Sequence, residues 1–346
     1  MNPPCYRPND KDQRPHSGAC PMSNLLDPAI LFFLFGAFAG LVKSNLEIPK
    51  PITRFLSLYL LMALGLRGGF ELAHSGLTPA VLYSLLCALL LAIVVPVLGY
   101  SLLRKVVGDF DAAAIAATYG SVSAVTFITA TRYLDNQGIP FGGHMAAAMA
   151  FMESPAIIIA IFIVNAIRQK ASPDAMQTHT PAKLSTLHIL KEALTDGAQF
   201  LLIGSVIIGM ITGEAGKAAM QPFAGDLFRG MLAFFLLDMG LMTARNFPPL
   251  KSLSPWLVAY ALLAPFVHAT LALGLSLFAH LPAGDAGLLM VLAASASYIA
   301  VPAVLRFAVP EANAALYFGL SLGITFPLNI IVGIPVYIGV AHHFIP

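Results

Sequence analysis

Two stretches of this sequence carry closely spaced hydroxyl groups in otherwise apolar surroundings. Residues 116–127 read AATYGSVSAVTF, and residues 292–303 read LAASASYIAVPA. Gly120 and Pro302 can each interrupt a helix, and an interruption exposes backbone N–H and C=O groups. The N-terminus of a half-helix then suits an anion, whereas free carbonyl and hydroxyl oxygens suit Na⁺. The residues predicted from this pattern to bind a small anion are Ser121, Ser123 and Thr126 together with Ser295 and Ser297. The alternative is that these small residues only allow close helix packing.

Acidic residues occur in two further apolar stretches. Glu153 lies in AMAFMESPAI and Asp238 in AFFLLDMGLM. A bare carboxylate at the bilayer centre costs at least ~3 kcal/mol, so each acid needs a cation, a base or a proton. Thr325 and Asn329 occupy the corresponding place in the second half of the chain. The sodium-binding residues predicted from this pattern are Glu153, Asp238, Thr325 and Asn329. The alternative is a carboxyl bonded to neighbouring backbone or hydroxyl groups.

The composition requires a lipid environment for these residues. Of the 346 residues, 58% are hydrophobic and only 10% are charged, whereas soluble domains carry about 25% charged residues. The formal net charge of +2 gives no sign of a nucleic-acid partner. No HExxH, GxGxxG or Walker motif occurs, so we expect neither an enzyme nor an organic cofactor. An acid/base enzyme would require Glu153, Asp238 and His268 to converge around one cavity.

The hydropathy pattern predicts an all-α integral membrane protein with about ten transmembrane helices. We expect a disordered N-terminal extension over 1–23, a first five-helix repeat over 24–167, a cytoplasmic loop and interfacial helix over 168–197, and a second five-helix repeat over 198–346. The predicted spans are 28–46, 53–71, 78–103, 111–131, 143–167, 198–214, 228–245, 255–280, 285–307 and 312–342.

Loop charges predict the orientation. The loops after the odd-numbered spans hold most of the basic residues, so the positive-inside rule places them in the cytoplasm. Both termini then lie outside the plasma (inner) membrane, and the 168–186 loop is cytoplasmic. The opposite loops hold only Arg67, Arg132, Lys217 and Arg229.

The two halves of the sequence match each other at a nearly constant spacing. Because each half has an odd number of spans, the second copy must cross the membrane in the opposite direction, as in inverted-repeat transporters. In such folds the substrate lies where the copies meet, so we expect the interrupted fourth and ninth helices to cross there. The matching residues are Asp111, Ser121, Ser123 and Arg132 with Asp285, Ser295, Ser297 and Arg306.

The segments YGSVSAVTF and AFMESPA resemble the sodium-dependent bicarbonate transporter family, and the resemblance extends from about Asn24 to the C-terminus. It also includes DLFRGMLAFFLLDMG at 226–240 and LLAPFVHA at 262–269. The resemblance implies Na⁺-coupled symport of bicarbonate into the cell, with Na⁺ as the coupling ion and a PII-like regulatory protein on the cytoplasmic side. It also implies that spans four and nine cross between a core domain and a gate domain. By the same resemblance, Gly120 lines the anion site with Ser123 and Thr126, so the predicted anion-binding residues number six. Assembly into a homo-oligomer is left open.

One departure from the family pattern concerns the cation site. Cyanobacterial members carry an acid directly after the serines of the ninth span, whereas Tyr298 follows Ser297 here. Asp238 is the hypothetical replacement charge. Two alternatives remain for the function: a cation-coupled transporter of another small organic or inorganic anion on the same fold, and a passive anion pathway.

Overall fold

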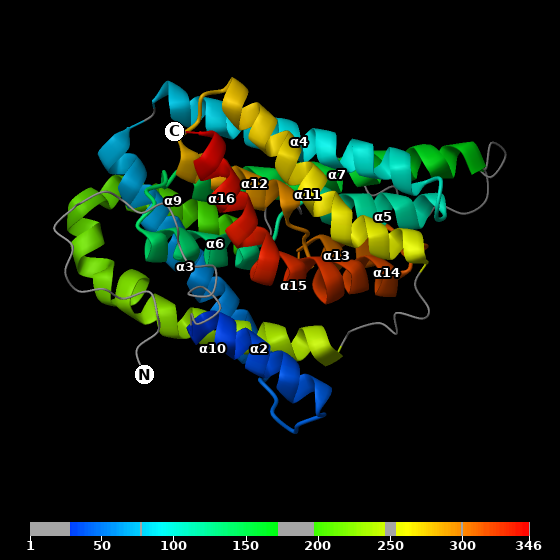
Figure 1. Ribbon diagram of the computed structural model, residues 1–346, viewed down its shortest axis with the longest axis horizontal. Helices are drawn as coiled ribbons and strands as arrows, with labels where there is room; N and C mark the ends of the chain where they lie inside the picture. Colours follow the sequence, from blue (N-terminus) through cyan, green and yellow to red (C-terminus); the bar gives the residue numbers. More distant parts are fainter. Residues whose placement is uncertain (1–27, 77, 172–196, 246–253, 299, 346) are drawn as a thin grey trace.

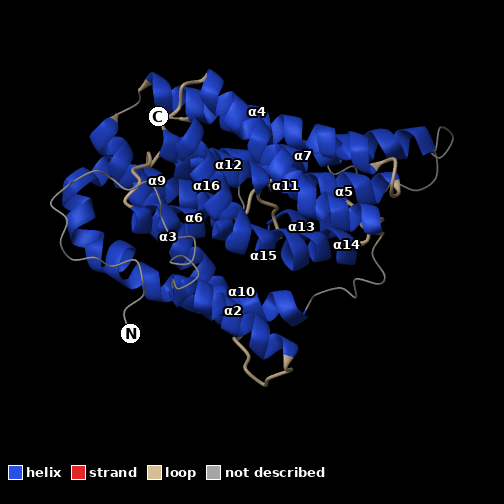
Figure 2. Cartoon of the chain, viewed as in Figure 1, coloured by secondary structure: helices blue, strands red, loops and turns tan. Residues whose placement is uncertain are grey.

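Every regular element that the structure describes is a helix (Figure 2). The computed structural model describes residues 28–76, 78–171, 197–245, 254–298 and 300–345. The predicted extension over 1–23 and the predicted interfacial helix lie outside these residues. An all-helical chain is expected in hydrocarbon, because a helix satisfies its backbone hydrogen bonds within one segment.

Seven helical stretches within the described residues are long and apolar enough to cross a bilayer. The longest, Phe200–Arg245, has 46 residues. At 1.5 Å per residue it would be more than twice as long as a ~30 Å hydrocarbon core if it were straight. It is not straight, because Gly213 has non-helical dihedral angles (φ 52°, ψ −140°). Two shorter apolar helices, Pro28–Leu41 and Ala283–Ala294, cover parts of the first and ninth predicted spans.

One group of helices, called here the four-helix bundle, combines two helices from each half of the chain. In this bundle α2 packs along α10 and α3 packs along α9, and the α2–α10 pair lies along one edge of the molecule (Figure 1). The bundle consists of α2 (Pro28–Leu41), α3 (Lys50–Ser75), α9 (Gly197–Met220) and α10 (Leu227–Arg245), with the π-helix η2 (Gln221–Asp226) between the last two.

Glycines allow the helix pairs of this bundle to approach to backbone contact. A Cβ atom on Gly36 of α2 would lie 2.1 Å from the Leu237 carbonyl oxygen, and one on Gly240 of α10 would lie 2.1 Å from that of Phe33. In the other pair, a Cβ on Gly69 of α3 would lie 2.2 Å from the Val206 carbonyl oxygen. Small residues at such contacts are typical of membrane helices, which pack by shape rather than by the hydrophobic effect.

The remaining helices form a second group, called here the crossing bundle. Within it, α4 packs on α5 and α7, and α11 and α16 pack on α12. The two interrupted segments lie inside this group (Figure 1). Its helices are α4 (Pro79–Leu103), α5 (Asp109–Gly120), α6 (Ala124–Gln137), α7 (Met145–Ala171), α11 (Pro255–Phe278), α12 (Ala283–Ala294), α13 (Ala300–Ala308), α14 (Ala314–Phe318), η4 (Gly319–Thr325), α15 (Phe326–Leu328), η5 (Asn329–Gly333) and α16 (Ile334–Phe344).

An ion pair holds one end of the crossing bundle together. Arg168, near the end of α7, donates two hydrogen bonds to the Glu311 carboxylate, at 2.9 and 2.7 Å. These hydrogen bonds lower the pKa of Glu311, which lies in the turn between α13 and α14. A third bond from Arg168 reaches the Ala308 carbonyl oxygen at 3.1 Å. The pair therefore fixes the end of α13 against α7.

The α2–α10 contact gives a first prediction. Gly240→Ala places a methyl group against the Phe33 carbonyl, so we expect it to lower the free energy of unfolding by about 1–3 kcal/mol, a typical cost of overpacking. Thermal unfolding of the purified protein in detergent measures the change. Gly230→Ala on the same helix is the control, since a Cβ there meets nothing within 4 Å. Equal stability of the two variants would contradict the packing argument.

Candidate functional site

The first interruption separates α5 from α6. Helix α5 ends at Gly120 and α6 begins at Ala124, and Ser121 has the extended dihedral angles φ −95° and ψ 177°. The Ser123 hydroxyl caps α6 by accepting a hydrogen bond from the Thr126 N–H at 3.2 Å, which is the ordinary way to start a helix. Close packing explains why position 120 is a glycine, because a Cβ atom there would lie 2.6 Å from the Pro96 ring of α4.

The second interruption separates α12 from α13. Helix α12 ends at Ala294 and α13 begins at Ala300. The Ser295 hydroxyl donates to the Leu292 carbonyl at 2.8 Å, and the Ser297 hydroxyl accepts from the Val301 N–H at 3.4 Å. The expectation that Pro302 causes this break is wrong. Pro302 lies in the first turn of α13, where a helix needs no N–H donor, so it helps to start the helix after the break.

The two interruptions are in direct contact. The Ser123 N–H donates to the Ser295 hydroxyl at 2.9 Å, and the Ser297 N–H donates to the Thr118 carbonyl at 2.8 Å. All four residues are buried. The N-termini of α6 and α13 thus meet the C-termini of α5 and α12, which brings positive and negative helix ends together. Such an arrangement can hold an anion and a cation side by side.

Glu153 lies beside the first interruption. The Ser121 hydroxyl donates to the backbone carbonyl of Glu153 at 3.3 Å, which connects the break to α7. Helix α7 continues through Pro155, and the Glu153 side chain is half-buried. Proline lacks an N–H, so it leaves one carbonyl a turn earlier without its helical partner. The part of α7 that contacts the first interruption therefore carries both an acidic residue and a carbonyl that Pro155 deprives of its helical donor.

Thr325 and Asn329 lie in the π-helical part of the last span. The Thr325 hydroxyl donates to the Ala261 carbonyl at 2.8 Å and lies 2.6 Å from the Tyr119 hydroxyl. The Asn329 side chain donates to the carbonyl of Ala294, the last residue of α12, at 2.8 Å. Its own amide oxygen accepts a bond from Tyr337 at 3.1 Å. Asn329 therefore caps the helix that leads into the second interruption.

Asp238 lies in the other group of helices. It is on α10 of the four-helix bundle, and its carboxylate accepts a hydrogen bond from the Thr53 hydroxyl of α3. The structure thus brings all six predicted anion-binding residues, together with Glu153 and Asn329, to the crossing region through direct bonds or backbone continuity. It gives Asp238 a partner elsewhere. Thr126 is at the crossing because its N–H bonds to the Ser123 hydroxyl. Thr325 does not bond to either interruption; it bonds to Tyr119 of α5 and Ala261 of α11.

The sequence did not reveal an aromatic row beside the second interruption. The Tyr298 ring packs on Phe326 with ring centroids 5.0 Å apart, and Phe326 packs on Phe33 of α2 at 5.5 Å. This row connects the interruption to the four-helix bundle. Tyr298 stood out in the sequence because it directly follows Ser297, but nothing in the spacing of Phe33 or Phe326 marked them.

The groups required for acid/base catalysis bond to different elements. His268 of α11 hydrogen-bonds the backbone of Ala293 on α12, whereas Asp238 bonds Thr53 on α3. The convergence that an enzyme would need is therefore not seen for these two side chains.

These features define a class of protein. A chain with several apolar helices of membrane-spanning length, and with two interrupted helical segments in contact with each other, is a multi-pass membrane protein built like a transporter. A model of the Na⁺-dependent bicarbonate transporter superfamily matches residues 28–342, and the chain belongs to this family. No curated protein matches the chain. The family implies a role in transport rather than catalysis, with bicarbonate and Na⁺ as the transported species.

The contact between the interruptions gives a second prediction. Ser295→Ala removes the acceptor of the buried Ser123 N–H, so we expect the free energy of unfolding to fall by about 1–3 kcal/mol, the cost of an unsatisfied buried donor. Thermal unfolding in detergent measures the loss. Ser101→Ala is the matched control, because its exposed hydroxyl bonds only the Val97 carbonyl of its own helix. An unchanged Ser295→Ala variant would show that the contact is not needed for stability.

Proposed function

We propose that this protein is a secondary active transporter that carries bicarbonate into the cell together with Na⁺. The observation that carries the proposal is the contact between the two interruptions, from Ser123 N–H to the Ser295 hydroxyl at 2.9 Å. Family membership favours bicarbonate and Na⁺ as the two solutes. Helix ends of both signs at one point supply the binding chemistry for such a pair.

Two inverted five-helix repeats, with ten spans in total, form part of this proposal. Helices α5 and α12 have the same length, 12 residues, and each is followed by a serine in extended conformation. Asp111 near the start of α5 accepts a hydrogen bond from the Asn313 N–H at 2.7 Å. Asp285 near the start of α12 accepts one from the Gly142 N–H at 2.6 Å. Equivalent residues thus make equivalent contacts, which supports the internal symmetry.

The proposed orientation follows from the loop charges. We place both termini outside the plasma (inner) membrane and the 168–186 loop in the cytoplasm, so that the most basic loops lie inside. The division into repeats over 24–167 and 198–346 keeps its predicted bounds. A PII-like regulator would then act on the cytoplasmic side, as the resemblance implies.

For the anion, the proposed site is the pair of helix N-termini at the crossing. Backbone N–H groups at the starts of α6 and α13, together with the hydroxyls of Ser121, Ser123, Thr126, Ser295 and Ser297, donate to bicarbonate oxygens. Bicarbonate is small, carries one negative charge and offers three oxygens, so it can accept from both breaks at once. A bicarbonate oxygen can replace the Ser295 hydroxyl as the acceptor of the Ser123 N–H. This exchange costs little free energy, because the buried N–H keeps an acceptor.

For the cation, the proposed ligands are the Glu153 carboxylate and the neutral oxygens of Thr325 and Asn329, with carbonyls freed by the interruptions. These are hard oxygen donors, which suit Na⁺. Na⁺ binds first and reduces the cost of bringing an anion to the carboxylate. Asp238 can add its charge only from the facing bundle, where Thr53 now holds it.

Alternating access then requires that the crossing bundle moves against the four-helix bundle. The two groups meet at the aromatic row of Tyr298, Phe326 and Phe33. Aromatic rings at such a seam interlock by shape and carry no long polar bonds that would have to break. The glycine contacts inside the four-helix bundle keep that group rigid.

Uptake of radiolabelled bicarbonate into proteoliposomes, with and without an inward Na⁺ gradient, tests this function. We expect uptake to depend on the Na⁺ gradient and to saturate with bicarbonate. Uptake without any Na⁺ dependence would reject the coupling, and rates far above those of a conformational cycle would indicate a passive pathway. Stronger competition by another anion would assign the transport to that anion instead.

Removal of the proposed cation ligand gives a third prediction. Glu153→Gln keeps the shape of the side chain and removes its charge, so we expect Na⁺-driven uptake to fall by roughly tenfold or more, with a matching rise in the Na⁺ concentration needed. Glu214→Gln, an exposed acid on α9, is the control. Thermal unfolding of the purified variant checks that it still folds. Normal uptake by Glu153→Gln would remove this residue from the site.

A further inference from the structure

A polar cavity of about 400 Å³ lies between the two groups of helices. Its walls come from α3, α9, η2 and α10 on one side, and from α6 and the 138–144 loop on the other. Phe127 also lines it, one turn after the start of α6, so the cavity approaches the first interruption. The four basic residues predicted to lie on the less basic face of the membrane all line this one cavity: Arg67, Arg132, Lys217 and Arg229.

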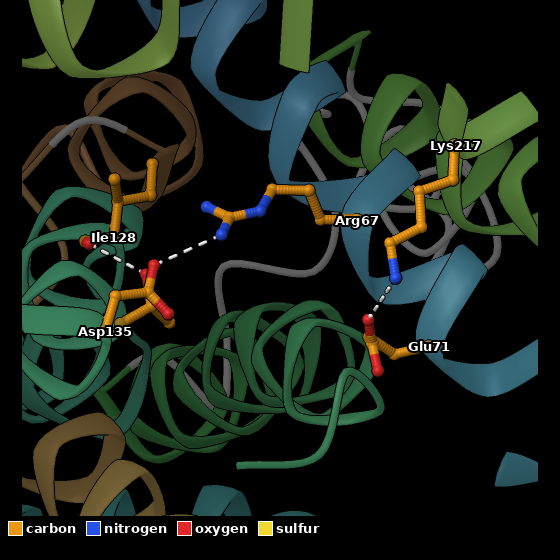
Figure 3. A network of polar contacts seen from close by, with 6 residues as sticks. Arg67, Glu71, Ile128, Asp135 and Lys217 are labelled. Carbon is orange, nitrogen blue, oxygen red and sulfur yellow. Dashed lines mark hydrogen bonds and ion pairs between the residues drawn. The ribbon is translucent and has the colours of Figure 1, made fainter. Parts of the chain in front are cut away.

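One ion pair in this cavity connects the two bundles. Arg67 Nη2 of α3 lies 3.1 Å from Asp135 Oδ2 of α6, and the two side chains point toward each other across the gap (Figure 3). The neighbouring pair, Lys217 with Glu71 at 3.2 Å, stays within the four-helix bundle. The side chains of Arg67 and Asp135 are 39% and 29% exposed, so dissolved ions can reach both.

The position of Arg67 does not depend on Asp135 alone. Its guanidinium carbon lies 5.6 Å from the centre of the Phe228 ring, which belongs to the same bundle. Such a cation–π contact holds the head group in place. The hydrogen bond described between Arg67 and Asp135 uses one nitrogen of the guanidinium, whereas this group can bind a carboxylate with two parallel N–H donors.

We propose that the Arg67 guanidinium binds a planar oxyanion of the carboxylate type, and we call it the receiving site for this anion. An anion bound there displaces Asp135 and so breaks the ion pair that connects the two bundles at the cavity. Bicarbonate and formate present the same O–C–O edge as the Asp135 side chain, so they can form the paired bonds with the guanidinium. An exposed ion pair contributes little to stability, so the exchange is easy. The identification of the natural anion as bicarbonate rests on the proposed function, whereas the site itself does not.

The exchange would couple capture of the anion to movement. While Asp135 holds Arg67, α3 and α6 are tied and the seam beside the cavity is closed. When the anion takes the guanidinium, Asp135 is released, and the crossing bundle is free to move. The cavity is lined by four basic and three acidic side chains, so its formal charge is positive by one and favours entry of an anion.

Binding of formate to the purified protein in detergent tests the receiving site without any transport. The readout is the concentration of sodium formate that gives half of the rise in thermal unfolding temperature, with sodium chloride replacing formate to keep ionic strength constant. Arg67→Lys keeps the charge and can keep one bond to Asp135, but loses the paired donors, so we expect this concentration to rise at least about fivefold. Asp135→Asn removes the carboxylate that competes with formate, so we expect the half-maximal formate concentration to fall.

Arg168→Lys is the matched control. Its pair with Glu311 has similar exposure but lies within the crossing bundle and outside the cavity, so we expect the formate concentration to stay at the wild-type value. Wild-type formate concentrations in both Arg67→Lys and Asp135→Asn would overturn the receiving site.

Exchange of the two charges separates a receiving site from a purely structural tie. The double variant Arg67→Asp with Asp135→Arg can re-form the ion pair, but it moves the guanidinium to the other bundle, away from Phe228. We expect bicarbonate uptake into proteoliposomes to stay impaired, and restored uptake would show that only the tie matters. If the wild-type protein takes up no bicarbonate, the proposed function is wrong. The formate titration still tests whether Arg67 binds an anion, because it does not depend on transport.

Discussion

The structure depends on the satisfaction of backbone groups in the middle of the crossing bundle. Interrupted helices leave N–H and C=O groups without helical partners, and hydrocarbon offers no water to replace them. Here each interruption supplies part of what the other lacks, through the Ser123–Ser295 and Ser297–Thr118 bonds. Asn329 satisfies a further carbonyl at the end of α12. The serines at the crossing therefore have a structural role of their own, because their hydroxyls and N–H groups hold the two interruptions together.

This constraint explains the division of the molecule into two groups of helices. The crossing bundle must surround the interruptions with polar partners, so it contains the short helices and the π-helical span. The four-helix bundle has no such task, and its helices pack by direct backbone contact at Gly36, Gly240 and Gly69. The two groups meet through aromatic rings near the interruptions and through the Arg67–Asp135 pair at the polar cavity. Close packing within each group thus contrasts with fewer contacts between the two groups.

Much of this architecture could be predicted from the sequence, because hydrocarbon imposes strong rules. The apolar composition required helices, and the Ser-x-Ser pairs at equal spacing from Asp111 and Asp285 located both interruptions. The cause of the second interruption was not predictable in the same way. A proline marks either the end or the start of a helix, and only the coordinates show that Pro302 follows the break.

Contacts between distant helices were harder to predict. Asp238 and Glu153 look alike in sequence, since both are single acids in apolar stretches, yet only Glu153 lies on a helix that bonds to an interruption. Arg67 was visible only as one of four basic residues on the less basic face of the membrane, although it lies on α3. Its bond to Asp135 depends on how two helices from different groups pack, and local residue patterns carry no such information.

The two aspartates near the starts of α5 and α12 have a consequence for biosynthesis. Each bonds to the backbone of the opposite half of the chain, Asp111 to Asn313 and Asp285 to Gly142, over separations of 202 and 143 residues. When the first half enters the membrane, the ribosome has not yet made Asp285, so the Gly142 N–H still lacks the acceptor it has in the final structure. Neither half can reach its final form alone, so assembly of this fold is completed only after nearly the whole chain has been inserted.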